Sequence, residues 1–241
     1  MAKESKIIFF DTETTGIDEG DRLCQIGYKI GDETFMELYK PPLTIPPGAS
    51  AVHHITNEMV KDRPAFIDSS DYKTIKSLFE SKNSIVVAHN MAFDFSMIKK
   101  EGINPVNTIC TLRVARYLDK ESKIAKHNLQ FLRYALNIEI AATAHDALGD
   151  VFVMEQLYYR LLKKIMVEEN LNEKEAIAKM IEISSRPSLM RVFSFGKHVG
   201  KKVEEVLVTN KDYLEWLLAE KEKKGLGEDD WIYTLRHFLG K

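Results

Sequence analysis

The sequence has few cysteines, no long apolar run and almost no net charge, and each shortage excludes a class of protein. The two cysteines, Cys24 and Cys110, lie inside apolar stretches, where buried free thiols are expected rather than a disulfide or metal ligands. No stretch approaches the roughly 18 apolar residues of a membrane-spanning helix, and residues 1–6 are too short and polar for a signal peptide. We therefore expect a cytoplasmic protein without a membrane partner.

The net charge of −2 excludes a protein that coats long nucleic acids through bulk positive charge. It does not exclude an enzyme whose bound metal ions supply positive charge at one site. At 241 residues, the chain is long enough for one ordinary domain and a smaller unit. The sequence contains no internal repeat and no low-complexity segment.

Short apolar runs alternate with amphipathic segments over the first 170 residues, which predicts an α/β domain with a mixed sheet. Gly31-Asp32 is suited to a tight hairpin turn between two strands. The expected strands cover residues 7–10, 22–30, 33–39, 84–88 and 108–110. The expected helices cover residues 68–82, 90–100, 112–118, 128–136 and 144–170.

The rest of the chain predicts a smaller unit after a connection. Residues 171–188 are expected to form a helical linker that ends at Arg186-Pro187-Ser188. Residues 189–241 predict a compact α+β module, with a strand over residues 191–195 and helices over residues 212–223 and 229–239. From Arg186 onward, 11 Lys and Arg against 9 Asp and Glu give +2, so this module is mildly basic.

Four acidic residues stand at the ends of apolar strands or in the apolar stripes of helices: Asp11, Glu13, Asp94 and Asp150. A lone Asp-x-Glu is usually a pair of solvated acids. Here Asp11 and Glu13 end an apolar strand and point the same way, roughly 7 Å apart, while the other two acids point toward the core. Clustered anions need a cation, and a hard divalent metal prefers oxygen ligands. The pattern predicts a magnesium or manganese site, where two ions about 4 Å apart would clamp an in-line displacement at phosphorus.

His145 lies five residues before Asp150, about 140° away around an ideal helix. The two side chains therefore do not share a helical face. We expect His145 just before the helix, with Asp146 as the N-cap, so that the imidazole approaches the acids from another direction.

Three segments now form a pattern: Phe10-Asp11-Thr12-Glu13-Thr14-Thr15-Gly16, His89-Asn90-Met91-Ala92-Phe93-Asp94 and His145-Asp146-Ala147-Leu148-Gly149-Asp150. In this order they resemble the motifs of the DEDDh class of 3′–5′ exonucleases, over roughly residues 5–165. The resemblance implies a ribonuclease H-like fold with a mixed five-stranded sheet flanked by helices. It assigns residues 1–170 to the exonuclease domain.

The resemblance also implies catalytic roles. Asp11, Glu13 and Asp150 would hold a first Mg²⁺ or Mn²⁺, and Asp11 and Asp94 a second. His145, neutral near pH 7, would take a proton from the attacking water, a contribution of about 10²–10⁴-fold.

In similar enzymes the residue after the first motif contacts the terminal bases, which here is Ile17. The backbone near Thr14 would bind the 3′ hydroxyl, while His53, Asn90 and Phe93 would line the terminal nucleotide. The segment that contains His53 resembles the family's Val-His-Gly-Ile, but this chain has His54 in place of the glycine.

Residues 195–201 and 212–217 resemble the small C-terminal module of exodeoxyribonuclease X-like proteins. Lys197, Lys201 and Lys202 on its turn are candidates for phosphate contacts, although such lysines are more often only solvated. The module is expected to bind DNA or a protein partner.

The predicted function is therefore hydrolysis at the 3′ end of a nucleic acid, DNA rather than RNA, with release of nucleoside monophosphates. A ribonuclease acting on RNA 3′ ends and a polymerase proofreading subunit remain alternatives. A binding scaffold that keeps only the fold is the alternative outside the enzymes, and it is disfavoured because no motif acid is missing.

Overall fold

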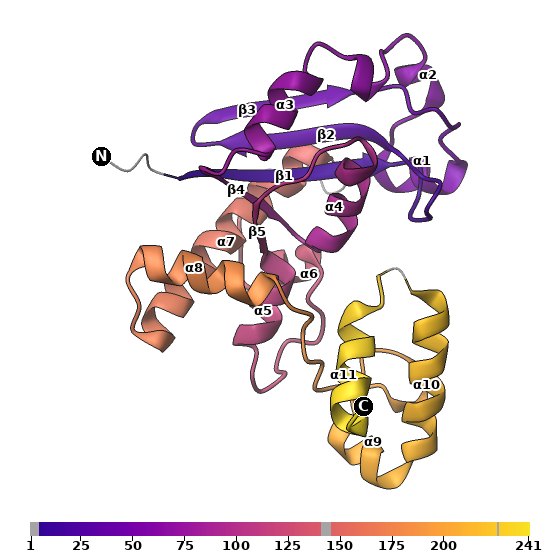
Figure 1. The fold of residues 1–241 in the computed structure, drawn as a ribbon, viewed down its shortest axis with the longest axis vertical. Coiled ribbons are helices and arrows are strands. Elements are labelled where there is room, and N and C mark those ends of the chain that lie inside the picture. The colour runs from indigo at the N-terminus through magenta and orange to yellow at the C-terminus, as the bar shows by residue number, and fades with distance from the viewer. Residues whose placement is uncertain (1–4, 141–145, 226) are drawn as a thin grey trace.

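The computed structural model describes residues 5–140, 146–225 and 227–241, which form a larger and a smaller body joined by a short connection (Figure 1). The strands are β1 (Lys6–Thr14), β2 (Leu23–Ile30), β3 (Glu33–Leu38), β4 (Ser84–Ala88) and β5 (Asn107–Cys110). The helices are α1 (Pro47–His53), α2 (Asn57–Val60), α3 (Tyr72–Phe79), α4 (Met91–Lys100), α5 (Thr111–Leu118), α6 (Leu129–Ala135), α7 (Ala147–Glu169), α8 (Glu173–Ser184), α9 (Val203–Thr209), α10 (Lys211–Lys224) and α11 (Asp229–Leu239). Two 3₁₀ turns, η1 (Phe66–Asp68) and η2 (Gly196–His198), complete the described elements.

The five strands form one mixed sheet, as expected, and their order is β3-β2-β1-β4-β5. The first three strands are antiparallel, whereas β4 and β5 run parallel to β1. Gly31 has a φ of 55° in the turn between β2 and β3, a conformation that glycine adopts without steric cost. All five residues of β4 are buried, as expected for a strand covered on both faces.

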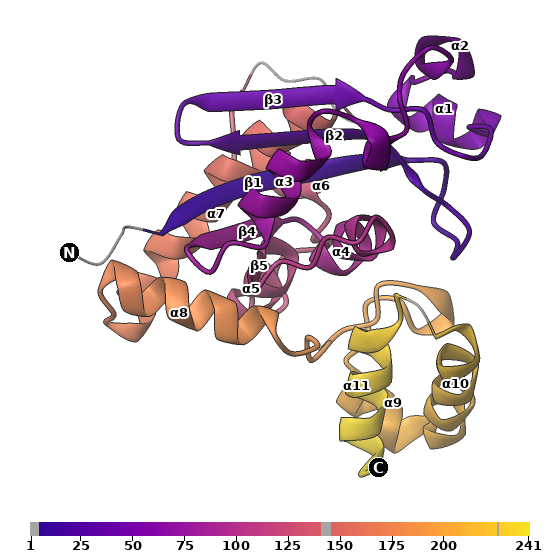
Figure 2. The ribbon, with the colours of Figure 1, turned by 45° about the horizontal axis from the view of Figure 1, so that its top comes forward.

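Helices cover both faces of the sheet, with α7 on one side and α3 on the other (Figures 1 and 2). Met154, Leu157 and Leu161 of α7 are buried in the main core, so the apolar stripe predicted for this helix is confirmed. The expected helix over residues 68–82 is shorter, because α3 begins at Tyr72 after the turn η1. None of the described helices is long and apolar enough to cross a membrane.

Helix α8 occupies part of the segment that was expected to be a linker. Its residues Ala176 and Met180 are fully buried in the main core, and the helix lies beside β5 and α5. The hydroxyl of Ser184 accepts a hydrogen bond of 2.8 Å from the backbone N–H of Cys110 in β5. The helical part of residues 171–188 is therefore packed on the larger body, and only the residues after it connect the two bodies.

The smaller body has its own core, built around Phe193, Leu214, Trp231 and Leu235. The strand expected over residues 191–195 is wrong: the segment forms only an isolated antiparallel bridge between Val192 and Lys202. A strand needs a partner of similar length, but the chain enters α9 at Val203, directly after Lys202. The β part of the predicted α+β module is thus a single bridge beside α9, α10 and α11.

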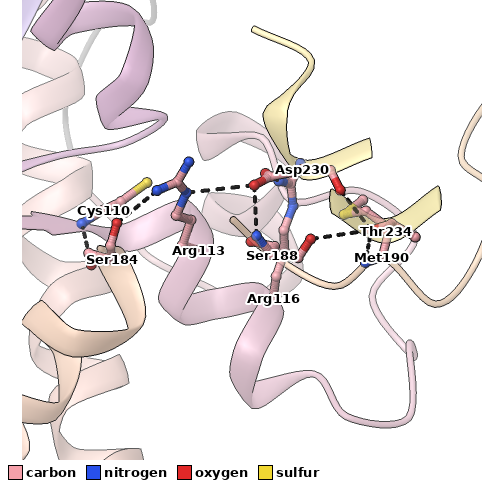
Figure 3. A network of polar contacts seen from close by, with 8 residues as sticks. All are labelled: Cys110, Arg113, Arg116, Ser184, Ser188, Met190, Asp230 and Thr234. Atoms are coloured by element: carbon pink, nitrogen blue, oxygen red, sulfur yellow. Dashed lines mark hydrogen bonds and ion pairs between the residues drawn. The ribbon is translucent and has the colours of Figure 1, made fainter. Parts of the chain in front are cut away.

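Polar contacts connect the two bodies through Asp230 at the start of α11 (Figure 3). Its carboxylate forms ion pairs with Arg113 and Arg116 of α5, and its Oδ1 accepts a hydrogen bond of 2.7 Å from the backbone N–H of Ser188. The larger body, the connection and the smaller body therefore meet at one carboxylate. Elsewhere in the fold, Cys24 and Cys110 are free and buried, as predicted.

Candidate active site

The site lies at the end of β1, where this strand extends beyond its pairing with β4. Pairing between β1 and β4 ends at Phe9 and Val87, whereas pairing with β2 continues to Thr14. Asp11 and Glu13 lie in this extension. Oxygens of Asp11, Glu13 and Asp150 lie within 4.8 Å of one another. Because metal–oxygen distances are about 2.0–2.1 Å for Mg²⁺, this spacing fits ligands of a common divalent ion.

Asp94 reaches the same place from the first turn of α4. Its Oδ1 accepts two hydrogen bonds from Thr12, one of 3.1 Å from the backbone N–H and one of 2.8 Å from the hydroxyl. The N–H of Thr12 lies beyond the β1–β4 pairing, so the carboxylate provides the partner that the sheet does not. Asp94 is 2% exposed.

Asp150 is positioned by the start of α7. Asp146 is the N-cap of this helix, as predicted, and accepts a hydrogen bond of 3.2 Å from the backbone N–H of Gly149. The first turn lies against Gly27 of β2, where a Cβ atom would come within 3.0 Å of the Ala147 backbone. Only glycine allows so close an approach. The Oδ1 atom of Asp150 accepts a hydrogen bond of 2.5 Å from Gln130 of α6.

The acids of the site raise one another's pKa values. Burial, followed by repulsion from Asp150 and Asp94, raises the pKa of Glu13 to about 8. Burial and the neighbouring acids also raise the pKa of Asp11 well above its ordinary value. Burial raises the pKa of Asp94 to about 7, although the hydrogen bonds from Thr12 oppose this effect. The site therefore attracts positive charge, and a divalent cation is the partner that its oxygens fit.

Of the predicted substrate residues, His53 contacts Thr14, and Ile17 lies just beyond with an exposed side chain. His53 is buried, and its Nε2 lies 3.1 Å from the carbonyl oxygen of Thr14. Thr14 donates a hydrogen bond of 2.7 Å from its hydroxyl to the carbonyl oxygen of Gly16. Ile17, just beyond, is 73% exposed, which is unusual for an isoleucine and leaves it available for contact. His145, the predicted general base, lies outside the described residues.

Two residues near the site have left-handed backbones. His54 has a φ of 63° where it ends α1, the conformation that glycine adopts at least cost, so the bend exists without the glycine of the resembling motif. Asn90 has a φ of 62° and is exposed at the start of α4, while Phe93 in the first turn is half-buried. The structure thus places Asn90 and Phe93 on the same turn as Asp94.

Sequence reasoning missed the residues that support the acids: Thr12, Gln25, Gly27 and Gln130. Gln25 pairs with Glu13 across the two strands and accepts a hydrogen bond of 3.3 Å from the backbone N–H of Ala147. The position of Thr12 between two predicted ligands, Asp11 and Glu13, could have indicated its supporting role. No sequence pattern indicates the role of Gln130, because its contact with Asp150 depends on how α6 packs against α7.

The fold and the site together define a class: a ribonuclease H-like nuclease whose acids meet at the end of the central strand. Residues 8–158 match the family described as Exonuclease, and residues 193–222 match the family described as Exodeoxyribonuclease X-like C-terminal. The chain belongs to the Exonuclease family, whose members depend on divalent metal ions. The class expected from the sequence is therefore confirmed.

Curated relatives resemble most of the chain. Exodeoxyribonuclease 10 of Escherichia coli strain K12 is 31% identical over 234 residues, covering 95% of this chain and 96% of that protein. The DNA polymerase III subunit epsilon of Buchnera aphidicola subsp. Acyrthosiphon pisum is 32% identical over 199 residues, covering 73% of this chain and 81% of that protein. Only the first of these alignments extends through almost the whole smaller body.

Solved structures share the fold of the larger body. Exonuclease X in complex with 5′ overhanging duplex DNA has a TM-score of 0.56 and 25% identity, covering 74% of this chain and 99% of that one. Exonuclease I of E. coli in complex with a dA16 oligonucleotide has a TM-score of 0.55 and 20% identity, covering 73% of this chain and 43% of that one. At 20% identity, the similarity to exonuclease I shows a shared fold.

Proposed function

We propose that this protein is a 3′–5′ exonuclease that hydrolyses DNA ends and releases nucleoside 5′-monophosphates. The observation that carries the proposal is the group of Asp11, Glu13 and Asp150 oxygens within 4.8 Å, with Asp94 held beside it by Thr12. DNA is favoured because the relative that matches nearly the whole chain is an exodeoxyribonuclease. The match to the Exodeoxyribonuclease X-like C-terminal family supports the same choice.

Asp11, Glu13 and Asp150 are proposed to hold one Mg²⁺ or Mn²⁺, with Asp11 and Asp94 serving a second ion. Bound ions of this kind polarise phosphoryl oxygens and stabilise the charge that develops in an in-line displacement. The carboxylates must be ionised to hold them, although burial favours their protonated forms. We therefore expect activity to rise with pH through the neutral range as protons leave the site.

His145 is proposed to accept the proton of the attacking water at an imidazole nitrogen. Support comes from its position in the sequence, one residue before the N-cap of α7 and five before Asp150. Thr14, Ile17, His53, Asn90 and Phe93 are proposed to position the terminal nucleotide. The exposure of Ile17 and the contact between His53 and the Thr14 carbonyl support this assignment.

A polymerase proofreading subunit is the second candidate, supported by the similarity to DNA polymerase III subunit epsilon over 73% of this chain. It shares the chemistry and differs in its partner. The match of residues 193–222 to a family of exodeoxyribonuclease tails favours the independent enzyme. RNA 3′ ends are the third candidate, because four carboxylates do not distinguish the sugar.

Digestion of end-labelled oligonucleotides tests the proposal. DNA and RNA strands labelled at the 3′ or 5′ end are incubated with Mg²⁺, Mn²⁺ or chelator, using the wild type and Asp11→Asn. We expect metal-dependent shortening of DNA from the 3′ end by the wild type and no shortening by Asp11→Asn. Shortening of RNA alone would leave the family assignment intact and overturn the DNA assignment. Equal activity of pure Asp11→Asn would overturn the site, and no activity on either polymer would favour the scaffold.

A further inference from the structure

The smaller body carries an exposed tryptophan next to a half-buried tyrosine. Tyr213 and Trp216 lie one turn apart on α10, with ring centroids 5.6 Å apart and planes inclined by 34°. Trp216 is 56% exposed, whereas Trp231 is 8% exposed and stacks on Phe193 in the core. The module therefore has a packed tryptophan that stabilises it and an exposed one that its core does not require.

The turn before α9 places a lysine over the ring of Tyr213. The Nζ atom of Lys197 lies 4.5 Å from the centroid of the Tyr213 ring. Gly196, with a φ of 68°, lets the turn approach closely, since a Cβ atom there would come 3.1 Å from the Tyr213 hydroxyl. Gly200, with a φ of 80°, donates a hydrogen bond of 2.8 Å to the carbonyl oxygen of Phe193. The turn thus places a positive charge at the Tyr213 ring, which neighbours the exposed ring of Trp216.

Trp216 also borders a shallow hollow. Phe195, Trp216, Leu217, Lys221, Lys223 and Lys224 line this hollow together with Glu220. The Nζ atom of Lys221 lies 4.7 Å from the centroid of the Phe195 ring. The surface therefore combines three rings, Tyr213, Trp216 and Phe195, with two lysines, Lys197 and Lys221, each of which lies over one ring.

The charge balance of this surface is positive. Lys221 and Lys224 share Glu228 at 2.7 and 3.0 Å, and Lys223 pairs with Glu220 at 2.6 Å. Three lysines at the hollow thus face two carboxylates. Lys197, Lys201 and Lys202 of the neighbouring turn have no carboxylate within 4.0 Å among residues 5–140, 146–225 and 227–241. An anionic ligand is favoured over a purely apolar one.

Helix α10 lies on the side of the smaller body away from α5, so its outer face is not covered by the larger body (Figures 1 and 2). An exposed ring with further rings and lysines beside it is a combination that binds single-stranded polynucleotides, because every base offers a flat face and every linkage a negative charge. We propose that Tyr213, Trp216 and Lys197 form a binding site for single-stranded polynucleotide, separate from the carboxylates of the larger body. Under the proposed function, this site retains a strand while its end is hydrolysed.

Closed circular single-stranded DNA tests this site without using the active site, because a circle has no 3′ end. Fluorescein-labelled circles are titrated with the full chain in chelator, and binding is followed by anisotropy. We expect Trp216→Ala to bind about 5- to 150-fold more weakly, the range that base stacking on an aromatic side chain gives. Lys197→Ala should lower the salt dependence by about one phosphate contact. Val208→Ala is the control, since Val208 is 86% exposed on α9 of the same body.

Two replacements of Trp216 separate stacking from apolar docking. Trp216→Phe keeps a ring and should bind within a few-fold of the wild type, whereas Trp216→Leu keeps apolar area only and should bind like Trp216→Ala. Stacking should also quench the tryptophan fluorescence of the wild type but not that of Trp216→Phe, which retains only the buried Trp231. Circular dichroism checks that each variant is folded.

Wild-type affinity in Trp216→Ala, or fluorescence that does not change when the circle is bound, would overturn the proposal. Equal binding of the Phe and Leu variants would also overturn it and favour a protein partner for this face. Hydrolysis of a four-nucleotide DNA with Mg²⁺ reports on the active site independently. We expect that rate to be unchanged in Trp216→Ala, so a failed binding test and a failed exonuclease test are distinguishable.

Discussion

Thr12 donates both its backbone N–H and its hydroxyl to the same oxygen of Asp94, at 3.1 and 2.8 Å. The two residues are 82 positions apart in the chain, so this contact connects the end of β1 to the first turn of α4. Both hydrogen bonds favour the charged carboxylate and oppose the effect of burial on its pKa. Thr12 thus favours the ionised form of Asp94, which a metal ion requires, against burial and the repulsion from neighbouring acids.

Thr12→Val should weaken the site without changing its shape. The valine keeps the volume but removes the hydroxyl, so the pKa of Asp94 rises further and more metal is needed to ionise it. A loss of apparent metal affinity of about 10- to 100-fold is typical when a residue that supports a metal ligand is removed. Titration of Mg²⁺ in the exonuclease assay measures this loss, and Thr12→Ser, which restores a hydroxyl, should recover most of it. Unchanged metal dependence of Thr12→Val would contradict this role.

Stability without metal should fall as the pH rises. The pKa of Glu13 is about 8 in the fold against 4.5 as its ordinary value, so the folded protein retains a proton that the unfolded chain releases. The contribution of Glu13 to the free energy of unfolding is therefore fully present below pH 4.5 and is lost as the pH approaches 8. A pKa that differs by one between the folded and the unfolded chain corresponds to about 1.4 kcal/mol in the free energy of unfolding.

Melting temperatures in chelator at pH 5, 6, 7 and 8 measure this dependence. Glu13→Gln should flatten the decline, because its side chain does not titrate. Mg²⁺ should stabilise the wild type more at pH 8 than at pH 5, since bound metal requires ionised ligands. A wild type that grows more stable in chelator between pH 5 and 8, with no difference from Glu13→Gln, would argue against the raised pKa of Glu13.

Gln130→Ala should reduce metal affinity by orienting Asp150 less firmly. The side-chain amide donates a hydrogen bond of 2.5 Å to Asp150, and loss of such a support typically costs about 10- to 100-fold in metal affinity. The rate at low Mg²⁺ should fall and recover at high Mg²⁺. Gln156→Ala is the matched control, because Gln156 is exposed on α7. Equal effects of the two replacements would exclude a specific role for Gln130.

Local patterns in the sequence were sufficient for most of the fold and for the acids that the structure brings together, Asp11, Glu13, Asp94 and Asp150. The apolar run before Asp11 and the helical stripes that contain Asp94 and Asp150 depend on periods of two and about 3.6 residues, which any short window contains. Contacts between distant elements have no such signal. Gly27 is required by α7, which begins at Ala147, and the burial of Met180 depends on where α8 docks.

The strand expected over residues 191–195 shows that a local pattern can also predict an element that does not form. Alternating apolar residues in Arg191-Val-Phe-Ser-Phe195 favour a strand, but the described residues provide no partner strand, and Phe193 packs on Trp231 instead. Tertiary context decides such short segments.

Asp230→Ala should loosen the connection between the two bodies. The carboxylate pairs with Arg113 and Arg116 of α5 and accepts a hydrogen bond from Ser188 (Figure 3). Its removal leaves two partly buried guanidinium groups without their anion, and the buried Nε of Arg116 already has no partner in the described part of the chain. Because these side chains remain about one fifth exposed, we expect a cost of about 1–3 kcal/mol, below that of a fully buried pair.

Limited trypsin digestion measures this loosening at Arg191, which is exposed in the connection that Asp230 holds. Cleavage there should accelerate in Asp230→Ala, while the larger body resists digestion and hydrolysis of a four-nucleotide DNA continues. Asp229→Ala is the matched control, because Asp229 lies in the same first turn of α11 and is exposed. Both replacements remove a charge near the start of the helix, so only the loss of the arginine contacts distinguishes them. Equal digestion of the two variants would mean that Asp230 does not hold the bodies together.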